Sequence, residues 1–119
     1  MNAYVTSTIE NGIGTIEFFH PQSNSMPSSQ LKNLVEEINN LGKNEEAKVI
    51  ILKSGGEKAF CAGASFDELI SIKDFETGKT FFSGFANVIN AMRKSPKLII
   101  ARIHGKAVGG GVGIACAAD

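Results

Sequence analysis

The opening of the chain alternates hydrophobic and polar positions and then changes to a helical repeat. Two β-rich runs, residues 3–9 and 13–19, flank the dipeptide Asn11-Gly12, which suits the positive φ angles of a tight hairpin turn. Residues 20–27 are polar and contain two prolines, each of which biases the preceding residue away from helix. The sequence therefore predicts a β-hairpin followed by a loop.

A helix is predicted directly after this loop. From Ser28 onward, apolar residues recur three and four positions apart, at Leu31, Leu34, Val35, Ile38 and Leu41. This spacing is typical of a helix with one buried face. Gly42 follows the last of these residues, and we expect it to supply the left-handed cap at the C-terminus of the helix.

The rest of the chain alternates strands with helices. Two short β-branched runs, residues 48–53 and 98–103, are typical of strands covered on both faces. Between them the pattern predicts a short helix over residues 66–72 and a longer one that ends before Pro96. The longer helix is expected to bury one stripe, formed by Phe81, Phe82, Phe85, Val88, Ile89 and Met92. A glycine-rich turn then leads into a helix of small residues, 111–118, so we expect an α/β fold.

The last ten residues need a cover that the chain does not provide. Residues 110–119 are nearly all small and apolar, and a terminal helix of this kind has to pack under further structure. We therefore expect residues 1–119 to be one incomplete domain, truncated from a longer protein.

Charge and hydropathy exclude several classes of function. The 119 residues carry 12 Lys and Arg against 12 Asp and Glu, a formal net charge of zero, which excludes the broad positive field of a general nucleic-acid-binding protein. No apolar run reaches the roughly 18 residues of a membrane span, and the first residues lack the features of a signal peptide. We expect a cytoplasmic protein with no nucleic-acid or membrane partner.

The cysteines and histidines do not form a metal or nucleophile motif. Cys61 and Cys116 have no Cys-x-x-Cys spacing and no histidine at metal-ligand distance. We expect both to be buried thiols, and we expect no metal. His20 and His104 have no neighbour in sequence that would orient either one as a general base.

Two segments of small residues are the candidates for chemistry. The first, residues 58–69, connects a strand to a helix that Ser65 or Asp67 can cap. The second, residues 104–113, places three consecutive glycines before a helix, whose first backbone N–H groups are unpaired and lie at its positive end. Two such segments can converge on one oxygen as an oxyanion hole. Each segment alone is weak evidence, because glycine-rich turns serve packing at least as often as binding.

Two competing motifs fail. Gly78-Lys79-Thr80 looks like the end of a phosphate-binding P-loop, but Lys73 stands where the leading glycine is required. Residues 63–67 resemble a nucleophile elbow that lacks its last glycine, which argues against a serine hydrolase.

Taken together, the motifs resemble those of the crotonase superfamily, the enoyl-CoA hydratase/isomerase family of acyl-CoA enzymes. The resemblance extends over almost the whole chain. It is carried by Asn11-Gly12-Ile13-Gly14-Thr15-Ile16, by His20-Pro21, by Asn24-Ser25-Met26, by Ala59-Phe60-Cys61-Ala62-Gly63-Ala64 and by His104-Gly105-Lys106-Ala107-Val108-Gly109-Gly110-Gly111. Members of the family are longer, so the chain looks like the N-terminal half of their catalytic core.

The resemblance implies a fold, an assembly and a site. It implies a spiral of ββα units, assembled as homotrimers or as pairs of trimers, with an acyl-CoA thioester as substrate. Two backbone N–H groups, which fall on Ala64 and Gly110, would hold the thioester oxygen. The coenzyme A portion would lie along a set of residues made up of Asn24, Ser25, Met26, Ala62, Ala64 and Gly109, with Phe60 and Leu69 as wall. Coenzyme A would be part of the substrate, so no separate cofactor is expected.

The chain departs from the family's hydratases at the acid and base. One family glutamate falls on Gly113, which cannot transfer a proton, and the second would lie beyond Asp119. Hydration uses two carboxylates, whereas double-bond migration can use one base and the same enolate. The departure favours isomerisation, or another reaction through an enolate, over ordinary hydration. Asp67 and Glu68 follow the first segment and could reach the site, but carboxylates at the start of a helix more often serve as caps. The other interpretation is an inactive module that binds CoA thioesters or serves assembly; in either case we expect the isolated chain to be inactive.

Overall fold

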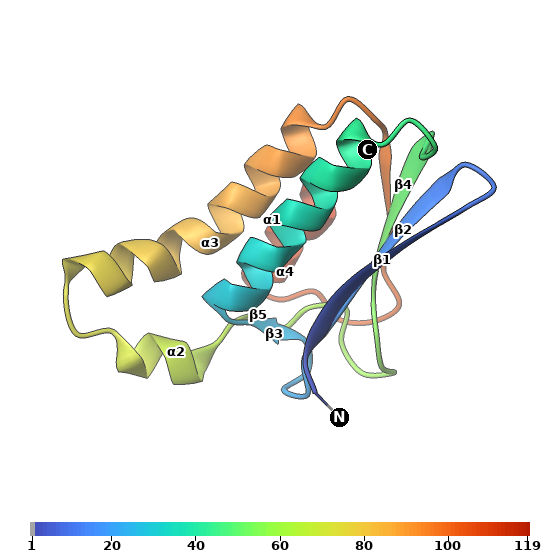
Figure 1. The fold of residues 1–119 in the computed structure, drawn as a ribbon. Helices are drawn as coiled ribbons and strands as arrows, with labels where there is room; N and C mark the ends of the chain where they lie inside the picture. Colours follow the sequence, from blue (N-terminus) through green and yellow to red (C-terminus); the bar gives the residue numbers. More distant parts are fainter. Residues whose placement is uncertain (1) are drawn as a thin grey trace.

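The computed structural model describes residues 2–119 as a mixed sheet with helices on one side of it (Figure 1). Four strands form the main sheet in the order β1-β2-β4-β6, and two short strands, β3 and β5, form a second pair. The strands are β1 Tyr4–Glu10, β2 Ile13–Phe19, β3 Ser25–Met26, β4 Val49–Ser54, β5 Gly63–Ala64 and β6 Ile99–Arg102. The helices are α1 Ser28–Lys43, α2 Phe66–Ser71, α3 Phe75–Lys94 and α4 Gly110–Ala117.

The hairpin forms as predicted. Strands β1 and β2 pair antiparallel from Tyr4 opposite Phe19 to Glu10 opposite Ile13. Asn11 and Gly12 both have positive φ, 53° and 81°, which is the combination that a two-residue type I′ turn requires.

The two central strands are buried on one face only, so the expectation of strands covered on both faces is wrong. In β4, burial alternates, with Ile50 and Leu52 fully buried and Ile51 only partly buried. In β6, Ile99 is buried but Ile100 is 55% exposed. The helices lie on one side of the sheet (Figure 1), and the other face is left open among the residues described.

Helices α1 and α3 form the main layer over the sheet. Gly84 allows their close approach, because a Cβ there would lie 2.6 Å from the Leu31 Cδ1. The predicted cap at Gly42 is wrong: α1 continues to Lys43 and ends at Asn44 with φ −84°. Gly42 is instead a buried helical residue, where a Cβ would approach the Pro96 ring to 3.3 Å.

The predicted apolar stripe of α3 is correct for only part of its residues. Phe81, Val88 and Met92 are buried, but Phe82 is 72% exposed. Neighbouring residues in a helix point about 100° apart, so Phe81 occupies the core position. Phe82 packs edge-on against it, with ring centroids 4.9 Å apart.

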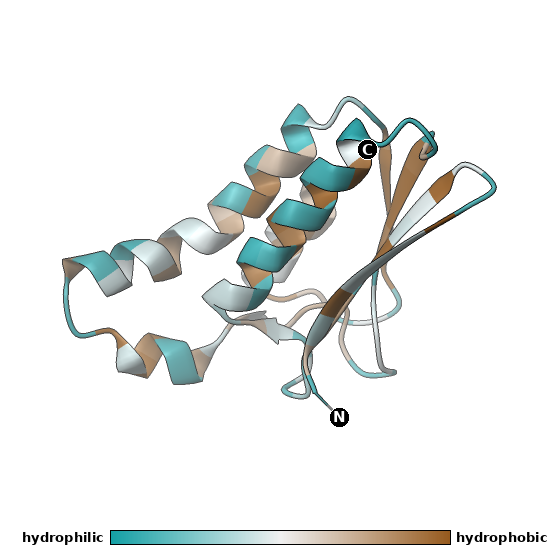
Figure 2. Cartoon of the chain, in the orientation of Figure 1, coloured by the Kyte–Doolittle hydropathy of each residue, from teal (hydrophilic) through white to brown (hydrophobic). Residues whose placement is uncertain are grey.

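Apolar side chains remain exposed at two places. Figure 2 shows apolar residues on α2 and at the start of α3, where Phe66, Ile70 and Phe75 are each more than three-quarters exposed. The terminal helix α4 buries only Gly111 and Ile114. Cys116 is exposed, against expectation, because no element of the described chain covers that face of α4, whereas Cys61 is buried as predicted.

No helix within residues 2–119 is both long enough and apolar enough to cross a membrane. Over the same residues, no group of three His, Cys, Asp or Glu side chains is close enough together to hold a metal ion.

Candidate active site

The two glycine-rich segments lie side by side. Residue 61 bridges to residue 107 in parallel fashion, and the Val108 N–H donates to the Cys61 carbonyl at 3.0 Å. One residue earlier, the Phe60 N–H donates to the Lys106 carbonyl at 2.9 Å. The chain from Phe60 to Ala64 therefore follows the approach to α4 residue by residue.

Two glycines make this approach possible. Gly63 has φ +97°, and a Cβ there would lie 2.9 Å from the Val108 oxygen and 3.6 Å from the Gly110 nitrogen. A Cβ at Gly111 would lie 2.4 Å from the Cys61 oxygen. Backbone thus meets backbone without side chains between, and Ala64, the residue after Gly63, lies beside the start of α4.

The start of α4 leaves one N–H group without an acceptor. Gly109 precedes the helix with φ 56° and ψ −126° and provides no side-chain cap. The next turn is closed by Gly111 N–H to Val108 O and by Val112 N–H to Gly109 O, at 2.9 and 3.0 Å. Within residues 2–119, no backbone acceptor pairs with the Gly110 N–H, which lies at the positive end of the helix.

The Gly110 position itself is enclosed on its side-chain side. A Cβ at Gly110 would lie 2.5 Å from the Phe85 ring, which comes from α3. An alanine or a proline at this position would place the same Cβ against the aromatic ring, so Gly110→Ala is the comparison that isolates the loss of the N–H in Gly110→Pro.

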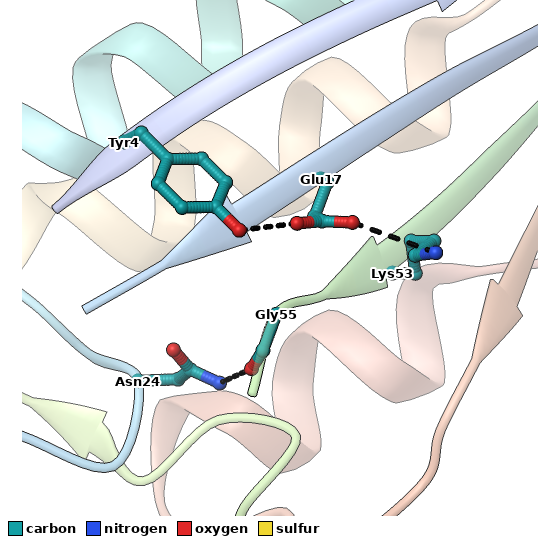
Figure 3. A network of polar contacts seen from close by, with 5 residues as sticks. All are labelled: Tyr4, Glu17, Asn24, Lys53 and Gly55. Carbon is teal, nitrogen blue, oxygen red and sulfur yellow. Dashed lines mark hydrogen bonds and ion pairs between the residues drawn. The ribbon is translucent and has the colours of Figure 1, made fainter. Parts of the chain in front are cut away.

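The loop before α1 is fixed by a buried asparagine. Ser23 and Asn24 both have left-handed φ angles, 57° and 59°. The Asn24 side chain donates to the carbonyls of Gly55 and Ala59, both at 2.9 Å, and accepts from the His20 N–H at 2.7 Å. Figure 3 shows the contact with Gly55. Asn24 is only 2% exposed, so its side chain shapes the loop and leaves only backbone for a ligand.

The other residues predicted to contact coenzyme A have unequal access. Ser25 and Met26 are buried in β3, which pairs with β5 through Ser25–Gly63 and Met26–Ala64. The Phe60 side chain is fully buried and packs edge-on against Phe18 with centroids 5.5 Å apart. Phe60 is therefore part of the core, and a ligand could meet only its backbone. Leu69, on α2, is 38% exposed and available.

The carboxylates that follow the first segment are both engaged. Ser65, one of two predicted caps, caps α2 by accepting from the Glu68 N–H at 3.2 Å. The Glu68 carboxylate accepts from the Ser28 N–H at 2.8 Å, and the Asp67 carboxylate accepts from the Gln22 amide at 3.1 Å. Both carboxylates fasten the preceding loop.

Cys61 and the two histidines differ in their surroundings. Burial raises the pKa of the Cys61 thiol, so it remains protonated at neutral pH. His20 Nδ1 accepts from the Gln22 N–H at 3.1 Å. Both ring nitrogens of His104 are buried without a partner among the described residues.

One polar network was not found from the sequence. The Tyr4 hydroxyl donates to Glu17 Oε2, and Glu17 Oε1 lies 3.4 Å from the Lys53 Nζ (Figure 3). The hydrogen bond to Glu17, with burial second, raises the pKa of Tyr4. Glu17 alternates with buried residues of β2 and could have been identified as outward-facing, but its pairing with Tyr4 depends on the hairpin register.

A separate hollow of about 900 Å³ lies between α1 and α3. It is lined by polar side chains such as Lys32, Asn39, Lys79 and Asn87. None of its lining residues belongs to the two glycine-rich segments, so we place the candidate site at the segments.

Comparison with known proteins identifies the family of the chain. The family model described as enoyl-CoA hydratase/isomerase matches residues 8–119. YngF of Bacillus subtilis, named as an enoyl-CoA hydratase/isomerase, is 32% identical over 123 residues, which cover 100% of this chain and 46% of that protein. The mitochondrial methylglutaconyl-CoA hydratase of Homo sapiens is 34% identical over 96 residues, which cover 81% of this chain and 28% of that protein.

Solved structures show the same fold. The crystal structure of an enoyl-CoA hydratase from Bacillus anthracis matches with a TM-score of 0.87 at 27% identity, over 100% of this chain and 46% of that one. The predicted crotonase-like α/β fold is thereby confirmed, and the chain spans less than half the length of the relatives it matches. Because the family model takes in both glycine-rich segments and nearly every other residue, the chain belongs to the enoyl-CoA hydratase/isomerase family.

Proposed function

We propose that the chain supplies the thioester-binding part of an acyl-CoA enzyme that reacts through an enolate. The observation that carries the proposal is the convergence of the two segments, which places the unpaired N–H of Gly110 beside the strand that ends in Ala64. The family supports an acyl-CoA substrate.

In this proposal the N–H groups of Ala64 and Gly110 donate to the thioester oxygen. As a proton leaves the carbon next to the thioester, negative charge develops on that oxygen, and donors fixed beforehand stabilise it by several kcal/mol. The hydrogen bonds of Asn24 and the backbone contact at Gly63 supply this fixation. Coenzyme A would follow the backbone of residues 24–26 and 62–64, with Leu69 on the open side.

The proton transfer itself needs groups outside the described site. Gly113 has no side chain, and both neighbouring carboxylates, Asp67 and Glu68, already accept hydrogen bonds from the loop. We therefore propose that this part of the protein binds and polarises the thioester, and that isomerisation or another enolate reaction is a better fit than ordinary hydration. The engaged carboxylates equally favour the second candidate, an inactive thioester-binding module.

Calorimetric titration with crotonyl-CoA and a turnover assay on the 119-residue chain test the proposal. We expect weak binding, no turnover, and a clear loss of affinity in Gly110→Pro, which removes the N–H. Gly110→Ala is the matched control, because it adds the same Cβ against the Phe85 ring and keeps the backbone N–H. The proposal fails if the wild-type chain does not bind, or if Gly110→Pro folds and binds as tightly as Gly110→Ala.

A further inference from the structure

Helix α1 begins without a cap of its own. Its N-cap is Pro27, which makes no side-chain cap hydrogen bond, and its first turn contains no acidic residue. The first N–H groups of a helix need acceptors, and a negative charge is favourable at that end. The acceptor for Ser28 N–H comes from Glu68, 40 residues away, at 2.8 Å.

Glu68 lies on α2, and a second carboxylate of α2 contacts the other end of the loop that precedes α1. Asp67 accepts from the side-chain amide of Gln22 at 3.1 Å. Between Gln22 and Ser28 lies β3, which pairs with β5. The segment 22–28 is thus attached to the chain of residues 63–68 at three places: at Gln22, through β3 and at Ser28.

The attachment matters because apolar packing holds neither α2 nor the two ends of the segment, whereas Met26, in the middle of the segment, is buried in the core. Helix α2 has six residues and none of them is buried. The segment 22–28 includes two successive non-glycine residues with left-handed φ, a conformation that persists only where the surroundings hold it. Helix α2 and the ends of the segment, at the exposed Gln22 and the half-buried Ser28, therefore depend on polar contacts for their positions.

We propose that Asp67 and Glu68 form a carboxylate clasp, the pair of contacts to Gln22 and Ser28, which fixes the loop against β5 and so positions the Ala64 N–H. The two residues act as positioning residues rather than as the acid or base. The existence of the clasp is independent of the proposed function, whereas its effect on thioester binding rests on that function.

Amide hydrogen exchange of the 119-residue chain, followed by NMR, measures the clasp directly. In Glu68→Ala we expect exchange at Ser28 and Ser25 to accelerate about tenfold, while amides of the buried strand residues Ile50 and Leu52 keep their rates. Glu68→Gln retains an oxygen that accepts from Ser28 N–H, and we expect it to restore most of the protection. Glu76→Gln is the matched control, because Glu76 is an exposed acid in the first turn of α3.

The same variants are titrated with crotonyl-CoA. We expect Glu68→Ala to bind several-fold more weakly and Glu68→Gln to bind nearly as tightly as wild type. If the wild-type chain does not bind crotonyl-CoA, the proposed function fails, and the exchange rates still decide whether the clasp exists. If exchange accelerates but affinity is unchanged, the positioning role is refuted.

Unchanged exchange at Ser28 and Ser25 in Glu68→Ala, or equal acceleration in Glu76→Gln, would overturn the clasp itself. If the amides of the core strands also exchange faster in Glu68→Ala, the whole fold is weakened, and the test is repeated with Gln22→Ala. That variant removes the Asp67 contact without touching α2, and we expect exchange at Ser25 to rise about threefold while Ile50 is unaffected. A wild-type rate at Ser25 in Gln22→Ala would then refute the clasp.

Discussion

The region around Gly63 and the region around α2 are neighbours in sequence but are built in opposite ways. Around Gly63, backbone meets backbone, and Asn24 adds three buried hydrogen bonds. On α2, by contrast, no residue is buried, and Phe66 and Ile70 are 77% and 82% exposed. The first region is held in place by contacts within the chain itself, whereas the second leaves apolar surface uncovered.

This contrast fits what an oxyanion-binding site needs. Donors that stabilise developing charge must be in place before the reaction, because reorganising them costs part of the stabilisation. An apolar surface beside such donors has no comparable requirement for fixed geometry, and it can be covered by a ligand or by further protein. Substitutions in the two regions should therefore have different costs.

The largest expected effect on stability is that of a single methyl group added in the region around Gly63, where two backbone segments meet. Gly111→Ala would place a Cβ 2.4 Å from the Cys61 carbonyl oxygen, where both sides are backbone and neither can move aside. We expect a loss of about 3 kcal/mol in the free energy of unfolding. Urea denaturation measures it.

The matched control for this change is Gly78→Ala, for which we expect a change in the free energy of unfolding in the opposite direction. At Gly78, in the first part of α3, a Cβ would make only ordinary contact, at 3.5 Å from Ile72. Gly78→Ala should stabilise the chain by up to roughly 1 kcal/mol, because alanine is the better helix former. Equal effects of the two substitutions would contradict the comparison.

The next effect concerns the buried asparagine. Asn24→Ala leaves the carbonyls of Gly55 and Ala59 without their donor in a buried site, and the left-handed φ of residue 24 disfavours alanine. We expect a loss of roughly 2 to 3 kcal/mol in the free energy of unfolding. Asn40→Ala, at an exposed position of α1, should change it by less than about 0.5 kcal/mol.

Much of the fold could be predicted from the sequence where the signal is local. Asn11-Gly12 specifies its turn through its own φ preferences, and the spacing from Leu31 to Leu41 specifies the buried face of α1. The sequence did not separate Ile50 from Ile51, because two adjacent β-branched residues give no indication of which one faces the helices. Phe81 and Phe82 present the same ambiguity in α3.

The candidate site was predictable only in part. The glycines of both segments stand out, and the resemblance to the family pointed to Ala64 and Gly110. The contacts that hold the site join residues far apart in sequence, such as Glu68 with Ser28 and Asn24 with Gly55. Such pairs leave no local pattern. Asn24 and Phe60 were expected to contact the ligand, but burial removes their side chains from it.

The exposed apolar side chains of α2 should affect the self-association of the chain rather than its stability. Because several large apolar side chains are exposed on α2 and α3, beyond what a soluble monomer commonly leaves uncovered, we expect the isolated chain to self-associate. Replacing Phe66 and Ile70 together by serine should lower the sedimentation coefficient and change the free energy of unfolding by less than about 0.5 kcal/mol. A wild-type chain that sediments as a single monomer contradicts this expectation.

The smallest effect is a pH dependence on the open face of the sheet. The hydrogen bond to Glu17 raises the pKa of Tyr4. The folded state therefore favours the protonated phenol, so its contribution is complete below about pH 10, the pKa of an unfolded tyrosine, and is lost as the pH rises through the higher folded value. Tyr4→Phe should lose slightly less stability than wild type across this range, as measured by urea denaturation at each pH. An identical pH profile would show that the hydrogen bond does not contribute.

The central claim is that Ala64 and Gly110 donate their N–H groups to a thioester oxygen, and the carbonyl carbon of the ligand reports on it most directly. Crotonyl-CoA labelled with ¹³C at the thioester carbonyl is bound to the 119-residue chain, and its resonance is compared in wild type, Gly110→Pro and Gly110→Ala, which shares the Cβ of proline and keeps the N–H. Hydrogen bonds that polarise the carbonyl move this resonance downfield. We predict a downfield shift on binding to wild type and to a folded Gly110→Ala, and a much smaller shift on binding to a folded Gly110→Pro. A bound wild-type resonance at the position of free crotonyl-CoA, or an equal shift with Gly110→Pro, would contradict the account.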